Sequence, residues 1–156
     1  MWGKSRQTLA MVDAARARGV DVSIDQYPYT ASSTSLSILF PAWSLEGEKE
    51  DVLARLKDPD IRARIRKDVL FNLIHDRGGN NPANVVVARC TWDPSLNGKS
   101  LADILHDRGQ PVSVDTAADL ALDLQERGGF SGIFHAMHEE DVRRIMQHPF
   151  TMIASD

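Results

Sequence analysis

Short segments with strand character alternate with longer segments of helical periodicity along most of this chain, and this alternation restricts the fold more than its composition does. Val20–Asp25 alternates apolar and polar residues, as a half-buried strand does, and residues 84–90 form a Val-rich strand pattern. Asp58 as N-cap with Pro59 in the first turn, followed by apolar residues at helical spacing, predicts a helix that ends before Gly78-Gly79. Such alternation is typical of α/β folds, in which helices connect parallel strands.

The remaining elements follow from the same signals. Ser5 as N-cap and Gly19 as the stop bound a first helix. We expect further helices at 100–108, closed by Gly109, at 116–127 and at 139–147, and further strands at 132–137 and 150–155. No linker, low-complexity tract or repeat interrupts them, so the sequence reads as one domain or one part of a domain.

Size and charge exclude several classes of protein. The 156 residues are well short of the roughly 250 that a complete TIM barrel needs. The net charge is -4, and the basic run 62–67 is interleaved with aspartates as on a solvated helix face, so nucleic acid is not an expected partner. No apolar run is long enough to cross a membrane. A single cysteine and the absence of a leader pattern favour the cytoplasm.

In parallel α/β folds the reactive groups gather at the carboxyl ends of the strands. Three places in the sequence are expected there, namely residues 25–29, residues 135–138 and Asp156. Asp156 ends the apolar run 150–154, and from this position alone it is either a base or metal ligand, or the N-cap of a following helix.

The other candidate side chains have simpler alternatives. His135 and His138 have a spacing that suits a metal on one helix, but here they straddle a strand end and a helix start, and separate packing roles explain them equally. Cys90 is either a nucleophile or, more commonly for cysteine, a buried apolar side chain. Three further histidines fall at helix ends or in turns: His75, His106 and His148.

Several segments, in order, carry a resemblance to a known family. Residues 25–34 read DQYPYTASST, residues 97–104 read NGKSLADI, residues 138–142 read HEEDV and residues 148–156 read HPFTMIASD. This ordered combination resembles the N-acyl-D-amino-acid deacylase (D-aminoacylase) family of the amidohydrolase superfamily. The resemblance extends over nearly the whole chain and matches the C-terminal part of the family's barrel.

The resemblance implies a zinc-dependent hydrolase that cleaves the amide bond of N-acyl-D-amino acids. In such a site the metal polarises the carbonyl group and lowers the pKa of bound water, while a carboxylate moves a proton to the leaving amine. The resemblance gives Asp156 this acid/base role and leaves a metal-ligand role open for it. Gln26, Tyr27, His135 and His138 are expected along the edge of the active site.

The family's paired-histidine metal motif and its other metal ligands have no counterpart in this sequence. Zinc is therefore not expected to be held tightly by this chain alone, and the chain alone is not expected to be a complete catalyst. The alternatives are another amidohydrolase substrate, or a non-catalytic fragment that needs a complementary chain.

The expected fold class is α/β: the last strands of a partial (β/α)8 TIM barrel with an inserted helical and strand subdomain. Residues 1–156 would form this partial amidohydrolase barrel, and residues 46–129 an insertion that acts as a lid over the active site. An open arc of a barrel has unpaired strand edges, so we also expect self-association or a complementary chain as partner.

Overall fold

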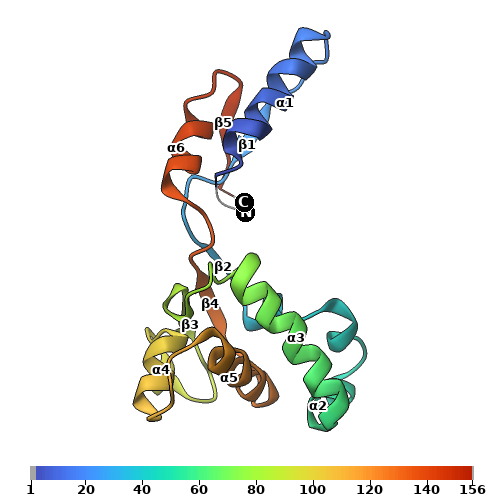
Figure 1. Cartoon of the computed structure of the whole chain (residues 1–156), viewed down its shortest axis with the longest axis vertical. Helices are drawn as coiled ribbons and strands as arrows, with labels where there is room; N and C mark the ends of the chain where they lie inside the picture. Colours follow the sequence, from blue (N-terminus) through green and yellow to red (C-terminus); the bar gives the residue numbers. More distant parts are fainter. Residues whose placement is uncertain (1–2, 156) are drawn as a thin grey trace. The chain divides into compact units, whose positions relative to one another are not determined.

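The chain forms two compact units, seen in a computed structural model that describes residues 3–155 (Figure 1). The first unit combines the segment that ends at Ala31 with the segment that begins at Met137. The second unit is the continuous segment Ser32–Ala136 between them. The fold is thus a mixture of helices and strands in which one unit interrupts the sequence of the other.

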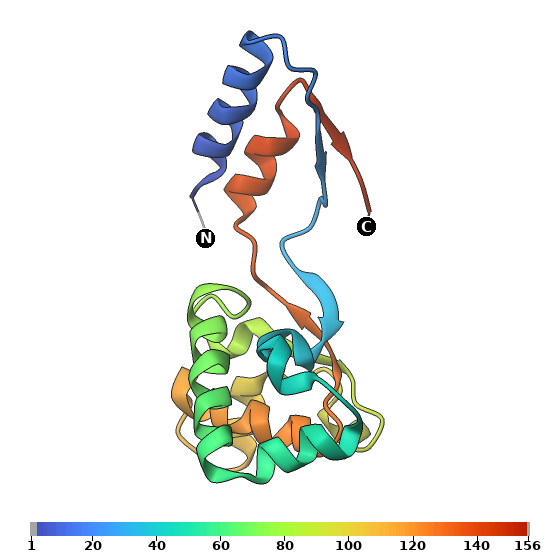
Figure 2. The ribbon, with the colours of Figure 1, turned by 90° about the vertical axis from the view of Figure 1, so that its right-hand side faces the viewer.

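The first unit contains two helices and two parallel strands. Its elements are α1 (Ser5–Ala17), β1 (Ile24–Gln26), α6 (Glu139–Met146) and β5 (Thr151–Ile153). The strands pair in parallel with Ile24 opposite Thr151 and Gln26 opposite Ile153. Helix α6 contacts both strands and α1 packs on α6 (Figure 2). This is the strand-and-helix layering that the sequence predicts for its two ends.

Both strands are shorter than their sequence patterns predict. The alternation begins at Val20, but pairing is confined to β1 because the Val22 carbonyl accepts a hydrogen bond from the Arg16 guanidinium instead of a strand. The partner strand β5 spans only Thr151–Ile153, within the predicted 150–155. A prediction from side-chain pattern alone therefore included residues whose backbone groups are not paired with another strand.

The start of α1 also differs from its prediction. Lys4 is the N-cap residue, and Ser5 lies inside the helix with its hydroxyl directed to the Asp141 carboxylate. The N-cap assignment of Ser5 was wrong because a partner distant in sequence takes its hydroxyl. Gly19 follows the helix with φ +85°, which confirms it as the stop.

The second unit contains an antiparallel sheet, which corrects the expectation of parallel strands throughout. Strands β2 (Ser32–Ser35) and β3 (Val85–Arg89) flank the central β4 (Ser131–Phe134), and both pair with it antiparallel. The predicted strand 132–137 therefore belongs to this sheet. Strand β2 has the sequence SSTS, which lacks apolar alternation, so the pattern gave no sign of it.

The second unit also contains helices. They are α2 (Lys49–Lys57), α3 (Pro59–His75), α4 (Leu101–Asp107) and α5 (Val114–Glu126), with short 3-10 turns at Leu36–Leu39, Ala42–Leu45, Pro82–Asn84 and Pro94–Leu96. The Asp58 side chain accepts hydrogen bonds from the backbone N–H groups of residues 60 and 61, which confirms its prediction as N-cap of α3. Helix α2 was not predicted.

The basic run on α3 is not simply solvated, because two of its arginines hold α5. Arg62 lies 2.5 Å from the Asp123 carboxylate and Arg66 lies 2.6 Å from that of Asp119. The pKa of Arg66 is raised, mainly by the hydrogen bond to Asp119. Acidic residues on α5 thus form ion pairs with basic residues on α3.

The main apolar core lies entirely within the second unit. Its members run from Leu36 to Phe134 and come from the sheet, the helices and the 3-10 turns. Cys90 is 1% exposed and is part of this core, which confirms the prediction of a buried apolar cysteine. The predicted insertion 46–129 falls inside this unit, and its role as a lid stays a prediction.

Helices that could cross a membrane are absent from residues 3–155, since none combines the necessary length with sufficient apolar character.

Candidate functional site

The carboxyl ends of β1 and β5 meet at one edge of the first unit. The two strands are parallel, and the Ala154 N–H donates to the Gln26 carbonyl at 3.0 Å, so pairing continues one residue beyond Ile153. The residues that follow β1, beginning with Tyr27, therefore leave the sheet beside the residues that follow β5. Asp156, the predicted acid/base, is the second residue after Ala154 and lies outside the described residues.

Gln26 is one of the few buried polar residues among residues 3–155, with 8% of its surface exposed. Its side-chain Nε2 donates to the Val142 carbonyl of α6 at 2.9 Å. Its Oε1 is buried and has no hydrogen-bond partner within the described residues. The amide group is thus turned toward helix α6, which gives Gln26 a clear packing role, while its predicted place at the active-site edge stays a prediction.

Tyr27 and Tyr29 form an aromatic pair directly after β1. Their ring centroids are 4.6 Å apart in an edge-to-face arrangement. Tyr27 is partly buried, whereas Tyr29 is 52% exposed. Pro28 between them has no N–H for a strand ladder, which explains why pairing ends here and the phenol groups are presented at the carboxyl end of β1.

His135 and His138 lie in different compact units. His135 follows β4 and its backbone N–H donates to the Asn84 carbonyl at 2.9 Å, within the antiparallel sheet of the second unit. His138 is the N-cap residue of α6 in the first unit. The argument from the edge of a parallel sheet therefore applies to the segment around His138 and not to His135, and the site roles of both stay predictions.

A zinc site does not assemble from the residues between 3 and 155. No group of three or more His, Cys, Asp or Glu side chains in that range could hold a metal ion. The other histidines have local surroundings: His148 Nε2 lies 3.0 Å from Asp13 Oδ1, the His75 ring lies 4.7 Å from that of Phe71, and His106 is exposed at the end of α4.

Asp141 joins the beginnings of α1 and α6, a contact that the sequence did not reveal. Its carboxylate accepts hydrogen bonds from the Ser5 hydroxyl and from the Gly3 N–H at 2.6 Å, and lies 3.1 Å from the Arg144 guanidinium. The Ser5 and Gly3 hydrogen bonds, with smaller help from Arg144, lower the pKa of Asp141. The only local signal was an acidic first turn in α6, which suits any helix N-terminus.

Two curated proteins of Alcaligenes xylosoxydans xylosoxydans are similar to this chain. An N-acyl-D-glutamate deacylase is 34% identical over 155 residues, and a D-aminoacylase is 30% identical over the same length. Each alignment covers 99% of this chain but 22% of the relative, so the chain spans about a fifth of their length. No protein-family model matches the chain.

Solved structures agree with these relatives. N-acyl-D-glutamate deacylase from Bordetella bronchiseptica, complexed with zinc and a phosphonate inhibitor that mimics the reaction's tetrahedral intermediate, matches with a TM-score of 0.54 and 30% identity. A D-aminoacylase structure described as defining a novel subset of amidohydrolases matches with a TM-score of 0.56 and 29% identity. A third, from work on the binuclear metal centre of D-aminoacylase, has a TM-score of 0.55 and 30% identity.

Each of these three structures matches 99% of this chain, which covers 23% of theirs. In sequence and in structure, therefore, the resemblance of this chain to the N-acyl-D-amino-acid deacylases is confirmed along almost its entire length.

Proposed function

We propose that this chain forms part of the active site of a zinc-dependent amidohydrolase that hydrolyses the amide bond of N-acyl-D-amino acids. The observation that carries the proposal is the parallel pairing of β1 with β5. Because of this pairing, the segment that begins at Tyr27 and the residues between β5 and Asp156 leave the sheet at the same edge. The similarity to an N-acyl-D-glutamate deacylase and a D-aminoacylase supports the choice of substrate class. A cytoplasmic location remains part of the proposal.

Asp156 is the residue to which we assign proton transfer. Water oxygen bonds to the amide carbon, the carbon–nitrogen bond breaks, and Asp156 carries the proton from water to the departing nitrogen. The products are a free carboxylic acid and a D-amino acid. Tyr27, Gln26, His135 and His138 remain proposed neighbours of the site, with Tyr27 favoured because it directly follows β1.

The described residues do not fit a zinc site by themselves, since they contain no group of three ligands that a catalytic zinc requires. We propose that the principal zinc ligands lie outside residues 3–155. A ligand role for Asp156 is included in the proposal.

The first unit is proposed to be an arc of a (β/α)8 barrel. Two parallel strands with α6 packed on them match part of the layering of such a barrel, α1 packs on α6, and both outer strand edges lack a strand partner within the described chain. Met152 and Ile153 on β5 are 54% and 57% exposed. We propose that a complementary chain, or a second copy, covers these edges.

Residues 46–129 are proposed to act as an insertion that covers the active site. In support, the second unit is inserted between β1 and α6, where a barrel needs only a short connection from strand to helix. Shortening this segment should then change KM for N-acyl-D-amino acids and leave the pairing of β1 with β5 intact.

A segment exchange tests the function directly. This chain would replace the matching segment of the Alcaligenes N-acyl-D-glutamate deacylase, and hydrolysis of N-acetyl-D-glutamate would be measured together with bound zinc. We expect an active, zinc-containing hybrid, and loss of roughly two to four orders of magnitude in kcat on Asp156→Asn. Asp21→Asn, at an exposed position, is the matched control.

The outcomes separate the alternatives. A folded, zinc-containing hybrid in which Asp156→Asn retains near-normal kcat would remove the catalytic assignment, because asparagine preserves a helix-capping role but not proton transfer. A hybrid that ignores N-acetyl-D-amino acids but hydrolyses cyclic amides would indicate another amidohydrolase substrate. Adding the rest of the relative as a separate chain tests whether a complementary chain suffices.

A further inference from the structure

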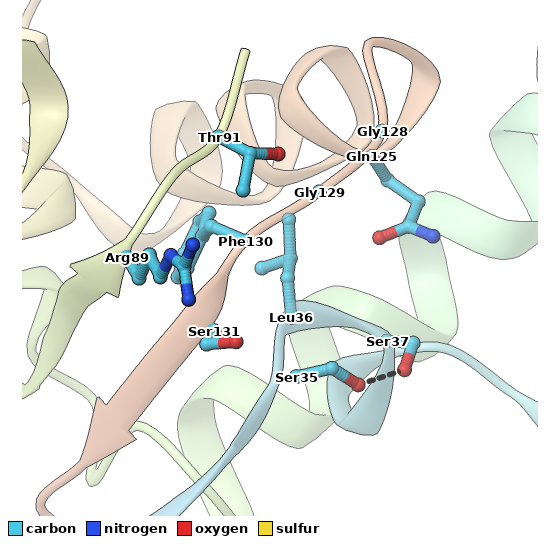
Figure 3. A pocket seen from close by; sticks show the side chains of 10 residues that line it. All are labelled: Ser35, Leu36, Ser37, Arg89, Thr91, Gln125, Gly128, Gly129, Phe130 and Ser131. Atoms are coloured by element: carbon cyan, nitrogen blue, oxygen red, sulfur yellow. Dashed lines mark hydrogen bonds between the residues drawn. The ribbon is translucent and has the colours of Figure 1, made fainter. Parts of the chain in front are cut away.

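A hollow lies wholly within the second unit. Its volume is about 430 Å³, within the range of small-molecule sites. Its lining comes from the ends of all three strands of the antiparallel sheet, from the turn after α5 and from the turn after β3 (Figure 3): Ser35, Leu36, Ser37, Arg89, Thr91, Gln125, Gly128, Gly129, Phe130 and Ser131.

A row of paired residues crosses the sheet at this hollow. Ser131 on the central strand β4 is opposite Ser35 of β2 and opposite Arg89 of β3. Directly paired residues project from the same face of a sheet. The two hydroxyl groups and the guanidinium group are therefore presented together by backbone register and not by flexible loops.

An irregularity in β3 is what places Arg89 in that row. Val87 is opposite Gly132, but Arg89 is opposite Ser131, so one additional residue is accommodated on β3 between the two pairs. In a regular strand Arg89 would project to the same face as Val87, which is fully buried. The bulge turns Arg89 to the exposed row instead, and such bulges commonly redirect a side chain beside a functional site.

Most of the residues that line the hollow are polar. The two large apolar members offer a ligand little or no surface, since Leu36 is fully buried and Phe130 is 6% exposed. In Figure 3 Arg89 and Ser131 lie on one side of the hollow and the Gln125 amide lies on the opposite side. Ser35 and Ser37 hydrogen-bond to each other through their hydroxyl groups at a third side.

The positive charge of Arg89 favours an anionic ligand. No acidic side chain lines the hollow, so Arg89 is a cation without a neutralising carboxylate in the lining. An arginine presents parallel N–H donors that match a carboxylate, and serine and threonine hydroxyls add further donors. A volume of about 430 Å³ leaves room for a small organic group beside the carboxylate.

We propose that this hollow binds a small molecule with a single carboxylate, anchored by Arg89. Ser131 and Thr91 add hydrogen bonds to the carboxylate. All residues of this site belong to the second unit, and the proposal is independent of the proposed hydrolase function.

Binding can be measured on the whole chain with butanoate as the probe and backbone amide NMR shifts as the readout. Butanamide, which has the same size without the charge, is the neutral control. We expect saturable shifts at Ser35, Arg89 and Ser131 with butanoate, and at least roughly tenfold weaker binding on Arg89→Gln. Arg89→Lys should be intermediate, because it keeps the charge but loses the paired donors.

Arg108→Gln, which removes another arginine of the same unit outside this hollow, should leave butanoate binding unchanged. Thermal unfolding checks that Arg89→Gln remains folded. Equal binding by Arg89→Gln and the unaltered chain, or equal shifts with butanamide, would overturn the proposal. Tighter binding of inorganic phosphate than of butanoate would overturn the assignment of a carboxylate ligand.

Discussion

The interiors of the two compact units are stabilised to different degrees by apolar burial. The second has a continuous apolar core between Leu36 and Phe134, in which most members are almost completely buried. In the described part of the first unit, Val142 at 7% exposure is the one buried apolar residue, and its other buried residues are Ser5 and Gln26. Burial of apolar surface is the dominant stabilising term in folding, so the second unit has much the larger share of it.

This difference indicates which unit depends on something else. A two-stranded sheet is marginal in water without further strands or a substantial apolar layer. The first unit has only two strands, and Met11, Met152 and Ile153 are each more than half exposed. The second unit therefore has the features of a self-sufficient domain, whereas the first has those of a part of a larger layer.

The largest expected effect is on the core of the second unit. Phe134→Ala should lower the free energy of unfolding by about 3–5 kcal/mol, because Phe134 is fully buried on the central strand and its loss leaves a cavity. Met152→Ala in the first unit should change it by about 0.5 kcal/mol or less, since Met152 is 54% exposed. Urea unfolding measures both, and equal losses would contradict the contrast between the units.

A smaller effect is expected at the start of α3. Asp58 accepts two backbone hydrogen bonds there, so Asp58→Ala should cost about 0.5–2 kcal/mol in the second unit. Asp58→Asn is the control, because asparagine caps about as well as aspartate. Hydrogen exchange in the first turn of α3 would localise the loss, and protection that is unchanged in Asp58→Ala would remove the capping role.

The sequence predicted the elements with strong local signals and missed those without them. Asp58-Pro59 for α3 and Ser100 with Gly109 for α4 are local backbone chemistry, and both helices begin and end close to the predicted residues. Strand β2 consists of serine and threonine, and its existence depends on β4, which is about a hundred residues away. Strand direction is likewise a property of the assembled sheet.

The candidate site was predictable to the same limited degree. The resemblance identified the segments around Tyr27 and Asp156, and the parallel pairing of their strands agrees with a shared edge. It could not show that Gln26 turns to the Val142 carbonyl, that Ser5 meets Asp141, or that a bulge redirects Arg89. Each of these depends on a partner distant in sequence or on register, neither of which a pattern of residue types contains.

The smallest expected effect concerns the polar contact that joins the two helices of the first unit. The pKa of Asp141 is lowered in the folded chain, first by the Ser5 hydroxyl and then by the Gly3 N–H. A carboxyl group whose pKa is lowered by folding contributes stability above its unfolded pKa, and this contribution is lost as the pH falls through the folded pKa. The NMR chemical shift of the Gly3 amide should therefore titrate with a midpoint pH below 3.8, which is the ordinary pKa of an aspartate side chain.

Asp141→Asn should abolish that titration at Gly3 while it keeps an oxygen that can accept the hydrogen bond. The charge-dependent loss at neutral pH should be below about 1 kcal/mol, as for other solvent-accessible ion pairs. Asp21→Asn, at a fully exposed position of the same unit, should leave the Gly3 titration unchanged. Asp103 in the second unit also has a lowered pKa, through Ser100 at the start of α4, but that contact stays within one helix end. A Gly3 midpoint at or above 3.8 would show that Asp141 does not join α1 to α6 in solution, and the first unit would then depend still more on a partner.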